Sequence, residues 1–225
     1  MSNANHKQNR ADEQDNEISL VVGSLFNYSP AEDRESYEEE REWVQQLQDS
    51  LRQEGVVIDL MTNPGVQIWE GGIRRYGDLY RLSQAAAYIE QGMDITPLLN
   101  KKFTEEEDLD PILKQIIEGD LDTQFPHFIK PDGDPFFYLP IEFADPIIIP
   151  VEAEEGFEFD EEDEDGEDDF VSFGSSPRLQ HELYILNNLL VQMQVPANHP
   201  VMRCLASLRQ AAELSVTNDL PIVVW

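Results

Sequence analysis

The sequence predicts an α+β fold: a single domain with a mixed sheet, an N-terminal strand-helix-strand and a C-terminal helical pair. Short apolar runs of strand length alternate with segments of helical period, the last two helical segments are consecutive, and 225 residues suit one large domain. The chain is 40% hydrophobic with 11 Phe, which is enough apolar material for a core. We expect a disordered tail at 1–17 and a domain at 18–225, with a disordered acidic insertion forming a mobile loop at 152–169.

The N-terminal elements are predicted from apolar runs and their spacing. Residues 18–26, ISLVVGSLF, are short, apolar and rich in branched side chains, which favours a buried strand. Over 36–54 the apolar residues stripe one face of a helix, and Gly55 follows as its stop. Residues 56–61, VVIDLM, are predicted as a second strand. Because a helix-length crossover joins the two strands, we expect them to be parallel neighbours.

The next stretch predicts a turn, a strand and two helices. TNPG at 62–65 has the residues of a tight turn, and VQIWE after it suits a paired strand. A helix is expected over 78–91, because its apolar residues share one face. Thr104 and Glu107 have the spacing of a capping box, so a second helix is expected to start there.

The second half of the chain predicts short strands followed by helices. Over 125–151, aromatic and branched residues are interrupted by Pro, which is typical of short strands near a sheet edge. FVSF at 170–173 returns to strand character. Ser176 is the expected N-cap of a helix that has Pro177 at its first position. A last helix at 201–214 and a short strand, PIVVW, close the chain.

The charge of the chain restricts its partners. The formal net charge is −31, and residues 152–169 hold 13 acids without a Lys or Arg, so −18 remains when this acid run is removed. A field of this sign repels phosphate backbones and anionic lipid. We therefore predict a basic protein partner, no nucleic acid binding and no membrane association. The sequence predicts no oligomeric state.

Three features predict the cellular location. Cys204 is the single cysteine, so the chain has no intramolecular disulfide. The N-terminal residues lack the apolar core of a signal peptide. The longest apolar runs are far shorter than the roughly 20 residues that a membrane-spanning helix needs. We expect a cytoplasmic protein.

A calcium-loop pattern lies in the acid run but fails in its register. Glu161, Asp163, Asp165 and Gly166 fall where a calcium loop has its first ligands and its glycine. The position that needs a bidentate acid at the end of the loop is Ser172. We predict no specific metal site and no cofactor, although clustered carboxylates attract divalent cations weakly.

No combination of residues predicts catalysis, and we assign no catalytic residue. The histidines at 6, 127, 181 and 199 do not form a pattern with a nucleophile. Cys204 falls on the apolar stripe of its predicted helix, as a small core residue does. GSSPRL at 174–179 is similar to an anion-binding turn before a helix but lacks the glycine spacing and lysine of a P-loop, so a helix cap explains it.

One segment, WEGGIRRYGDLYRL at 69–82, combines aromatic, glycine and arginine residues densely. Such residues are enriched at binding hot spots, and three of the 15 basic residues of the chain lie here. The alternative is that the arginines pair with nearby acids at the surface. The predicted partner-binding residues are Trp69, Arg74, Arg75, Tyr76, Tyr80 and Arg81.

Three functions are compatible with these features, and we favour the first. It is a non-catalytic acidic protein-binding factor, such as an inhibitor, an immunity-like protein or an assembly accessory, that covers a basic surface. DNA mimicry is a sharper version of it, but mimicry requires a rigid array of charges, and the acid run is expected to stay mobile. The second is a divalent-metal-dependent hydrolase with Asp59 and Glu70 as ligands. The third is a regulatory accessory whose acid run covers a chaperone-like surface.

Overall fold

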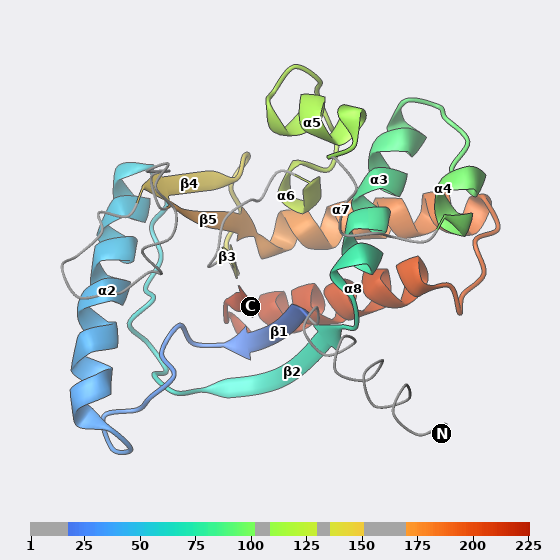
Figure 1. Ribbon diagram of the computed structural model, residues 1–225. Coiled ribbons are helices and arrows are strands. Elements are labelled where there is room, and N and C mark those ends of the chain that lie inside the picture. Colours follow the sequence, from blue (N-terminus) through green and yellow to red (C-terminus); the bar gives the residue numbers. More distant parts are fainter. Residues whose placement is uncertain (1–17, 102–108, 130–135, 151–169) are drawn as a thin grey trace, which may run out of the picture.

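The fold is α+β, with one mixed sheet and helices on both of its faces (Figure 1). The computed structural model describes residues 18–101, 109–129, 136–150 and 170–225. The strands in these ranges are β1 (Ile18–Gly23), β2 (Gln67–Ile73), β3 (Phe136–Leu139), β4 (Ile147–Pro150), β5 (Phe170–Ser175) and β6 (Ile222–Val224). The helices are α2 (Arg34–Gln53), α3 (Tyr76–Glu90), α4 (Thr96–Asn100), α5 (Pro111–Ile117), α6 (Pro126–Ile129), α7 (Ser176–Gln192) and α8 (Pro200–Asn218).

The described strands form one sheet in the order β2-β1-β6-β3-β5-β4. Neighbouring strands are antiparallel except β3 and β5, which are parallel. The three-residue strand β6 lies between β1 and β3, with Leu20 of β1 opposite Val224. The last residues of the chain therefore join the β1–β2 pair to the other three strands.

Side chains alternate between the two faces along the central strands. In β3, Phe137 packs on one face of the sheet and Tyr138 packs on the other. In β6, Val223 and Ile222 divide in the same way. These strands are buried on both faces, which explains why their sequences read as continuous apolar runs.

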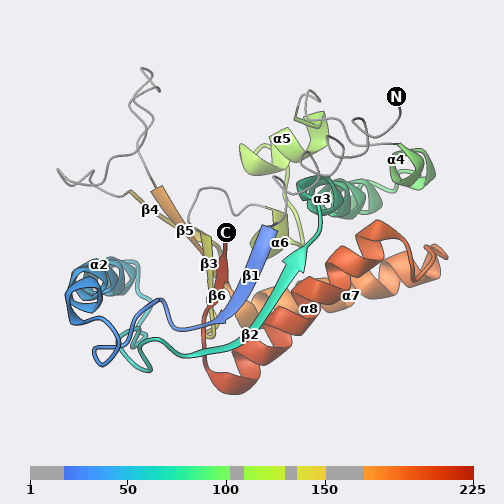
Figure 2. The same cartoon turned by 60° about the horizontal axis from the view of Figure 1, so that its bottom comes forward.

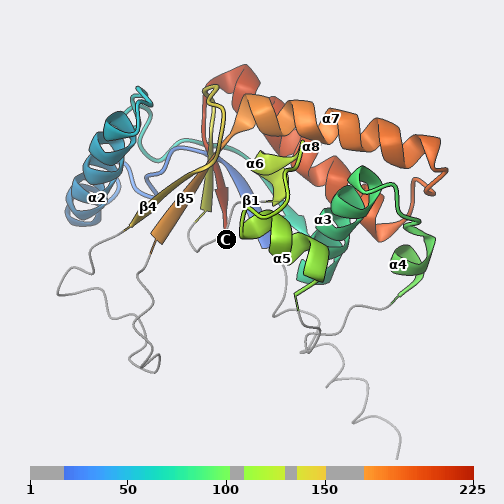
Figure 3. The same ribbon diagram turned by 90° about the horizontal axis from the view of Figure 1, so that it is seen from above.

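Two hydrophobic clusters cover the two faces. On one face α2 packs its buried residues Val44, Leu47 and Leu51 against β3, β4 and β5. On the other face α3, α5, α7 and α8 enclose the larger cluster. Seen from above, α2 stands alone on one side of the sheet, and α3, α7 and α8 lie on the other side (Figure 3). Among the described residues, α2 is therefore the one helix on its side of the sheet, and its face away from the sheet is exposed.

The predicted C-terminal helical pair is confirmed as α7 and α8. They lie side by side and are joined by a short connection over 193–199 (Figure 2). Leu179, Leu183, Leu186 and Leu190 of α7 are fully buried, as their helical spacing predicts. None of the helices in the described parts of the chain has the length and apolarity needed to cross a membrane.

The strand predicted at 56–61 does not form, and the predicted parallel pairing is wrong. This segment has no strand partner and follows α2 as an irregular connection, with Val56 and Leu60 buried in the same cluster as the apolar face of α2. The backbone nitrogen of Leu60 donates to the Gln48 side-chain oxygen at 2.8 Å. The chain instead returns as β2, antiparallel to β1, so the N-terminal strand-helix-strand exists with a later second strand.

The helix caps are shifted from their predicted positions. Ser175 caps α7 by accepting a hydrogen bond from Arg178, so Ser176 is the first helical residue and not the cap. Asp110 caps α5, where Pro111 takes the first position without losing a hydrogen bond. The capping box at 104–107 lies outside the described residues. So do the tail at 1–17 and all of the acidic insertion at 152–169, and the domain boundaries stay predictions.

A buried polar junction holds the short helix α6 against the sheet. The Glu182 carboxylate of α7 accepts hydrogen bonds from the backbone nitrogens of His127 and Phe128, at 3.2 and 2.9 Å. The His127 ring accepts at Nδ1 from the Ser175 nitrogen, so Nε2 carries the proton and donates to the Ala144 carbonyl. Burial raises the pKa of Glu182 to about 8 and lowers the pKa of His127.

Candidate partner-binding surface

Helix α2 begins at a capped N-terminus. The Asp33 carboxylate accepts hydrogen bonds from the backbone nitrogens of Glu35 and Ser36, at 3.1 and 3.2 Å. It satisfies two of the backbone donors that a helix leaves free at its start. Glu35 in the first turn also interacts favourably with the positive end of the helix dipole. The first turn is therefore held in place although it is exposed.

Aromatic contacts fix α2 to the sheet and to the preceding loop. The indole of Trp43 meets the ring of Phe137 on β3 edge-on, with centroids 6.0 Å apart. Tyr37, one and a half turns earlier, packs on Phe26 at 5.3 Å. Such ring pairs add to the stabilisation from buried area and define an orientation. The helix is therefore fixed along its length relative to the central strands.

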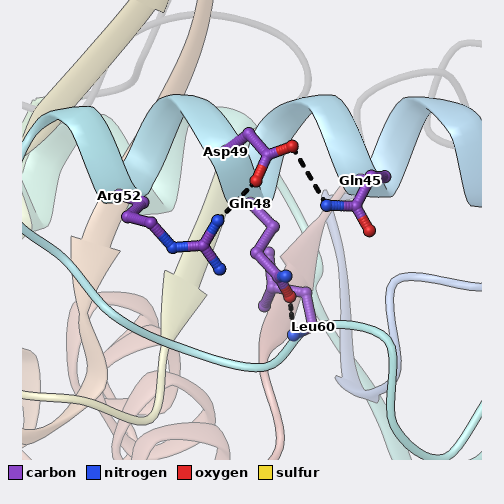
Figure 4. A network of polar contacts seen from close by, with 5 residues as sticks. All are labelled: Gln45, Gln48, Asp49, Arg52 and Leu60. Carbon is purple, nitrogen blue, oxygen red and sulfur yellow. Dashed lines mark hydrogen bonds and ion pairs between the residues drawn. The ribbon is translucent and has the colours of Figure 1, made fainter.

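Two polar tethers cross from α2 to flanking segments. The Glu40 carboxylate accepts hydrogen bonds from the backbone nitrogens of Asn27 and Tyr28 and from the Asn27 side chain. Gln48 accepts the Leu60 hydrogen bond from the connection after the helix, as Figure 4 shows. The segments before and after α2 are thus both bonded to its middle.

The free face of α2 carries a row of carboxylates, which we call the acid stripe: Glu35, Glu39, Glu42 and Asp49. All four side chains are exposed, and their spacing of four, three and seven residues places them on one line of the helix. This line is opposite the buried residues of α2. The carboxylates are therefore presented to solvent by a helix whose other face is locked in the core.

The charge density of the first half of α2 approaches that of one DNA strand. From Glu35 to Glu42 the helix holds five acids and one arginine. Over a rise of 1.5 Å per residue this is roughly one net negative charge per 3 Å. A DNA strand carries about one charge per 3.4 Å of axis. The helix therefore provides a rigid charge array, the feature that the acid run was expected to lack.

The structure splits the predicted partner-binding residues between surface and interior. Arg74, Arg75 and Tyr76 are exposed at the junction of β2 and α3, with the Tyr76 ring stacked on Tyr80 at a centroid distance of 6.4 Å. Trp69 is half-buried against the larger cluster. Its indole lies over Gly71, where a side chain would collide with it.

Arg81 is buried, with 5% of its surface exposed. Its Nη1 donates to the Gln84 side-chain oxygen, and Gln84 in turn donates to the Asp110 carboxylate. Tyr88 donates to the same carboxylate, and the Asp110 nitrogen donates to the Tyr80 hydroxyl. Arg81 and Tyr80 thus belong to a network that joins α3 to the start of α5. The six-residue site stays a prediction, and only part of it faces solvent.

The acid stripe and the predicted site lie far apart. In Figures 1 and 3, α2 is at one end of the molecule and the start of α3 is beyond the opposite side of the sheet. The structure therefore does not combine the two sets of residues into one surface. The apolar periodicity of residues 36–54 predicts the helix but does not reveal the stripe. The spacing of Glu35, Glu39 and Glu42 is the signal that identifies it.

The residues proposed for metal chemistry are not brought together. The carboxylate of Asp59 accepts from the Met61 nitrogen in the connection after α2, and Glu70 accepts from Gln67 on β2. Within the described ranges, no group of three or more His, Cys, Asp or Glu side chains could hold a metal ion. The calcium-loop acids of the sequence pattern lie outside these ranges.

Comparisons with known proteins give one family. Searches of curated proteins and of solved structures each found no match to the chain. A family model described as "Putative DNA-mimic protein" matches residues 16–224, a range that includes every described helix and strand.

This match corrects the partner prediction made from the sequence. That prediction was a basic protein partner, no nucleic acid binding and no membrane association, with DNA mimicry as a sharper version of the binding function that a mobile acid run does not support. The family description overturns it, because DNA is the molecule that the family is described as imitating. The sequence places the highest acid density in the acid run, whereas the described structure has a rigid charge array on α2. The chain belongs to the family described as "Putative DNA-mimic protein", whose model it matches over nearly its whole length.

Proposed function

We propose that the chain is a non-catalytic inhibitor of a DNA-binding protein, and that the acid stripe of α2 occupies the surface where that protein holds a DNA strand. One observation supports this function above the others. Glu35, Glu39 and Glu42 project from a single line of a helix whose opposite face is buried against the sheet.

The physical basis is the way in which proteins bind the DNA backbone. Lysine and arginine side chains neutralise phosphates, and this sequence-independent contact supplies much of the affinity. Carboxylates held on a rigid helix of comparable net charge density offer negative charges to the same side chains. Because α2 is already ordered by its core contacts, binding does not have to order the charged segment first. A flexible acidic peptide of equal charge lacks this advantage.

Displacement from immobilised DNA tests the proposal. Cell proteins bound to duplex-DNA cellulose are eluted at constant salt with the wild-type chain or with a Glu35→Gln, Glu39→Gln, Glu42→Gln variant. We expect the wild type to release a defined set of proteins and the variant to release little of it. The released proteins are then identified and purified for direct binding measurements.

A control variant of equal charge separates the effect of the position of the carboxylates from the effect of total charge. Asp120→Asn, Asp122→Asn, Glu213→Gln removes three exposed carboxylates at places away from α2. This control is expected to release the same proteins as the wild type. The proposal is wrong if the control and the α2 variant lose the same fraction of release, or if polyglutamate releases the same set as the wild-type chain.

A further inference from the structure

An arginine row borders the acid stripe on one side only. Arg34, Arg41 and Arg52 are seven and eleven residues apart, which is two and three helical turns, so they align along one flank of α2. All three are exposed. The opposite flank carries Ser36, Trp43 and Ser50, which are half-buried because this flank borders the sheet, and it has no basic residue within the helix.

Two ion pairs place these arginines beside the stripe. The Nε of Arg41 lies 2.8 Å from the Glu38 carboxylate, and the Nη1 of Arg52 lies 2.6 Å from the carboxylate of Asp49. Figure 4 shows Arg52 reaching back along the helix to Asp49, whose other oxygen accepts from Gln45. About half of each of these four charged side chains is exposed, so the pairs contribute little to stability. Their main effect is on the field that a partner meets.

The row makes the field of α2 asymmetric. A partner cation that approaches the stripe over the half-buried serine and tryptophan flank meets the carboxylates of Glu35, Glu39 and Glu42 without passing a guanidinium. A cation that approaches from the other flank first meets a guanidinium. In contact with that flank, the two positive groups are closer than the screening length of about 8 Å in physiological salt, so their repulsion is not screened out. Like charges facing one another disfavour such an approach, and specific interfaces use repulsion of this kind against wrong partners.

We propose that Arg34, Arg41 and Arg52 are specificity-determining residues of this surface: they repel cationic proteins that approach from their flank and fix the orientation in which a DNA-binding protein engages the acid stripe. This inference rests on the proposed function. A row of carboxylates alone attracts a cationic surface from either side. With arginines along one flank, the row favours cationic surfaces that approach from the other flank.

The test compares three chains with two binding partners. The border variant is Arg34→Gln, Arg41→Gln, Arg52→Gln. The control variant, Lys114→Gln, Arg203→Gln, Arg209→Gln, has the same net charge but removes exposed cations of α5 and α8. Each chain is titrated with a labelled poly-lysine of about 20 residues and with a purified protein that the wild type releases from DNA cellulose, and Kd is measured by fluorescence anisotropy. Thermal unfolding confirms that all three chains are folded.

We expect the border variant to bind poly-lysine about fivefold or more tightly than the control variant, because the repulsion removed is local to the stripe. We expect both variants to bind the DNA-binding protein within about twofold of the wild type. Equal poly-lysine affinities of the two variants would show that only total charge matters and would overturn the inference. So would an equal gain of the border variant for both partners. If the wild type releases no protein from DNA cellulose, the proposed function fails and the inference fails with it.

Discussion

The indole of Trp43 meets the Phe137 ring edge-on at 6.0 Å, and this contact joins the acidic helix α2 to the centre of the sheet. Phe137 is 1% exposed and stacks in turn on Phe173 of β5. The carboxylates on the free face of α2 are thereby held by the packing of the core. Rigidity and charge, which the proposed mimicry requires together, are supplied by opposite faces of one helix.

The first prediction concerns this contact. Trp43→Ala should lower the free energy of unfolding by about 2–4 kcal/mol, because it removes a large half-buried ring from the α2 face of the core. Trp43→Phe, which keeps a ring beside Phe137, should lose about half as much or less. Urea unfolding monitored by circular dichroism measures both. Equal stability of the alanine variant and the wild type would show that the ring pair does not anchor α2.

The second prediction concerns the cap of α2. Asp33→Ala removes the acceptor for the Glu35 and Ser36 nitrogens and should cost about 1 kcal/mol of stability. Asp33→Ser keeps an N-cap oxygen and should recover most of that loss. Urea titrations measure the free energy of unfolding of both variants. A serine variant as unstable as the alanine variant would argue against a capping role for Asp33.

The third prediction is a decrease in stability as pH rises, caused by Glu182. Its folded pKa of about 8 lies above its ordinary value, so between these values the folded state holds a proton that the unfolded state has released. Its contribution is therefore complete below about pH 4.5 and is lost as pH rises through 8. The loss over this range is on the order of 5 kcal/mol. Unfolding free energies from pH 5 to pH 9 should fall for the wild type and stay flatter for Glu182→Gln. A parallel decrease in both chains would assign the effect to other groups.

The fourth prediction concerns His127, whose pKa is lowered by burial. Protonation would place a proton on Nδ1, where the neutral ring accepts the Ser175 hydrogen bond, so the folded state favours the neutral ring. This contribution is present above the unfolded pKa of about 6.5 and is lost as pH falls through the lower folded pKa. His127→Phe should be about 2 kcal/mol less stable than the wild type at pH 7.5, because the variant lacks both hydrogen bonds of the ring. The difference should be smaller at pH 5, because the wild type loses this contribution as pH falls and the variant has no imidazole to protonate. A loss that does not change with pH would contradict the assignment.

The sequence predicts most of the helices and strands, because their packing follows from local periodicity. The apolar stripes of α2, α3, α7 and α8 and the short runs of β1, β5 and β6 all recur in the structure. Residues 56–61 were wrongly predicted because an apolar run does not reveal whether the backbone has a strand to pair with. Here the run is buried by α2 and bonded to Gln48.

The candidate surface was harder to predict than the fold. Acid density alone points to 152–169, whereas the fixed array on α2 depends on the contact between Trp43 and Phe137, two residues far apart in the sequence. The charge of Arg81 likewise predicted an exposed side chain. In the structure Arg81 is buried, because it donates a hydrogen bond to Gln84, which in turn donates to the Asp110 carboxylate. Burial of a charged residue depends on such partners, and their proximity is a tertiary property.

The most direct test of the account is competition between α2 and DNA for one protein. A DNA-binding protein released from DNA cellulose is saturated with a fluorescent duplex, and the chain is titrated in while the anisotropy of the duplex is followed. We expect the wild type to displace the duplex. The Glu35→Gln, Glu39→Gln, Glu42→Gln variant should need a concentration at least about tenfold higher for the same displacement. The control Asp120→Asn, Asp122→Asn, Glu213→Gln should stay within about twofold of the wild type. A chain that binds the protein without displacing the duplex, or an α2 variant that competes as well as the control, would contradict it.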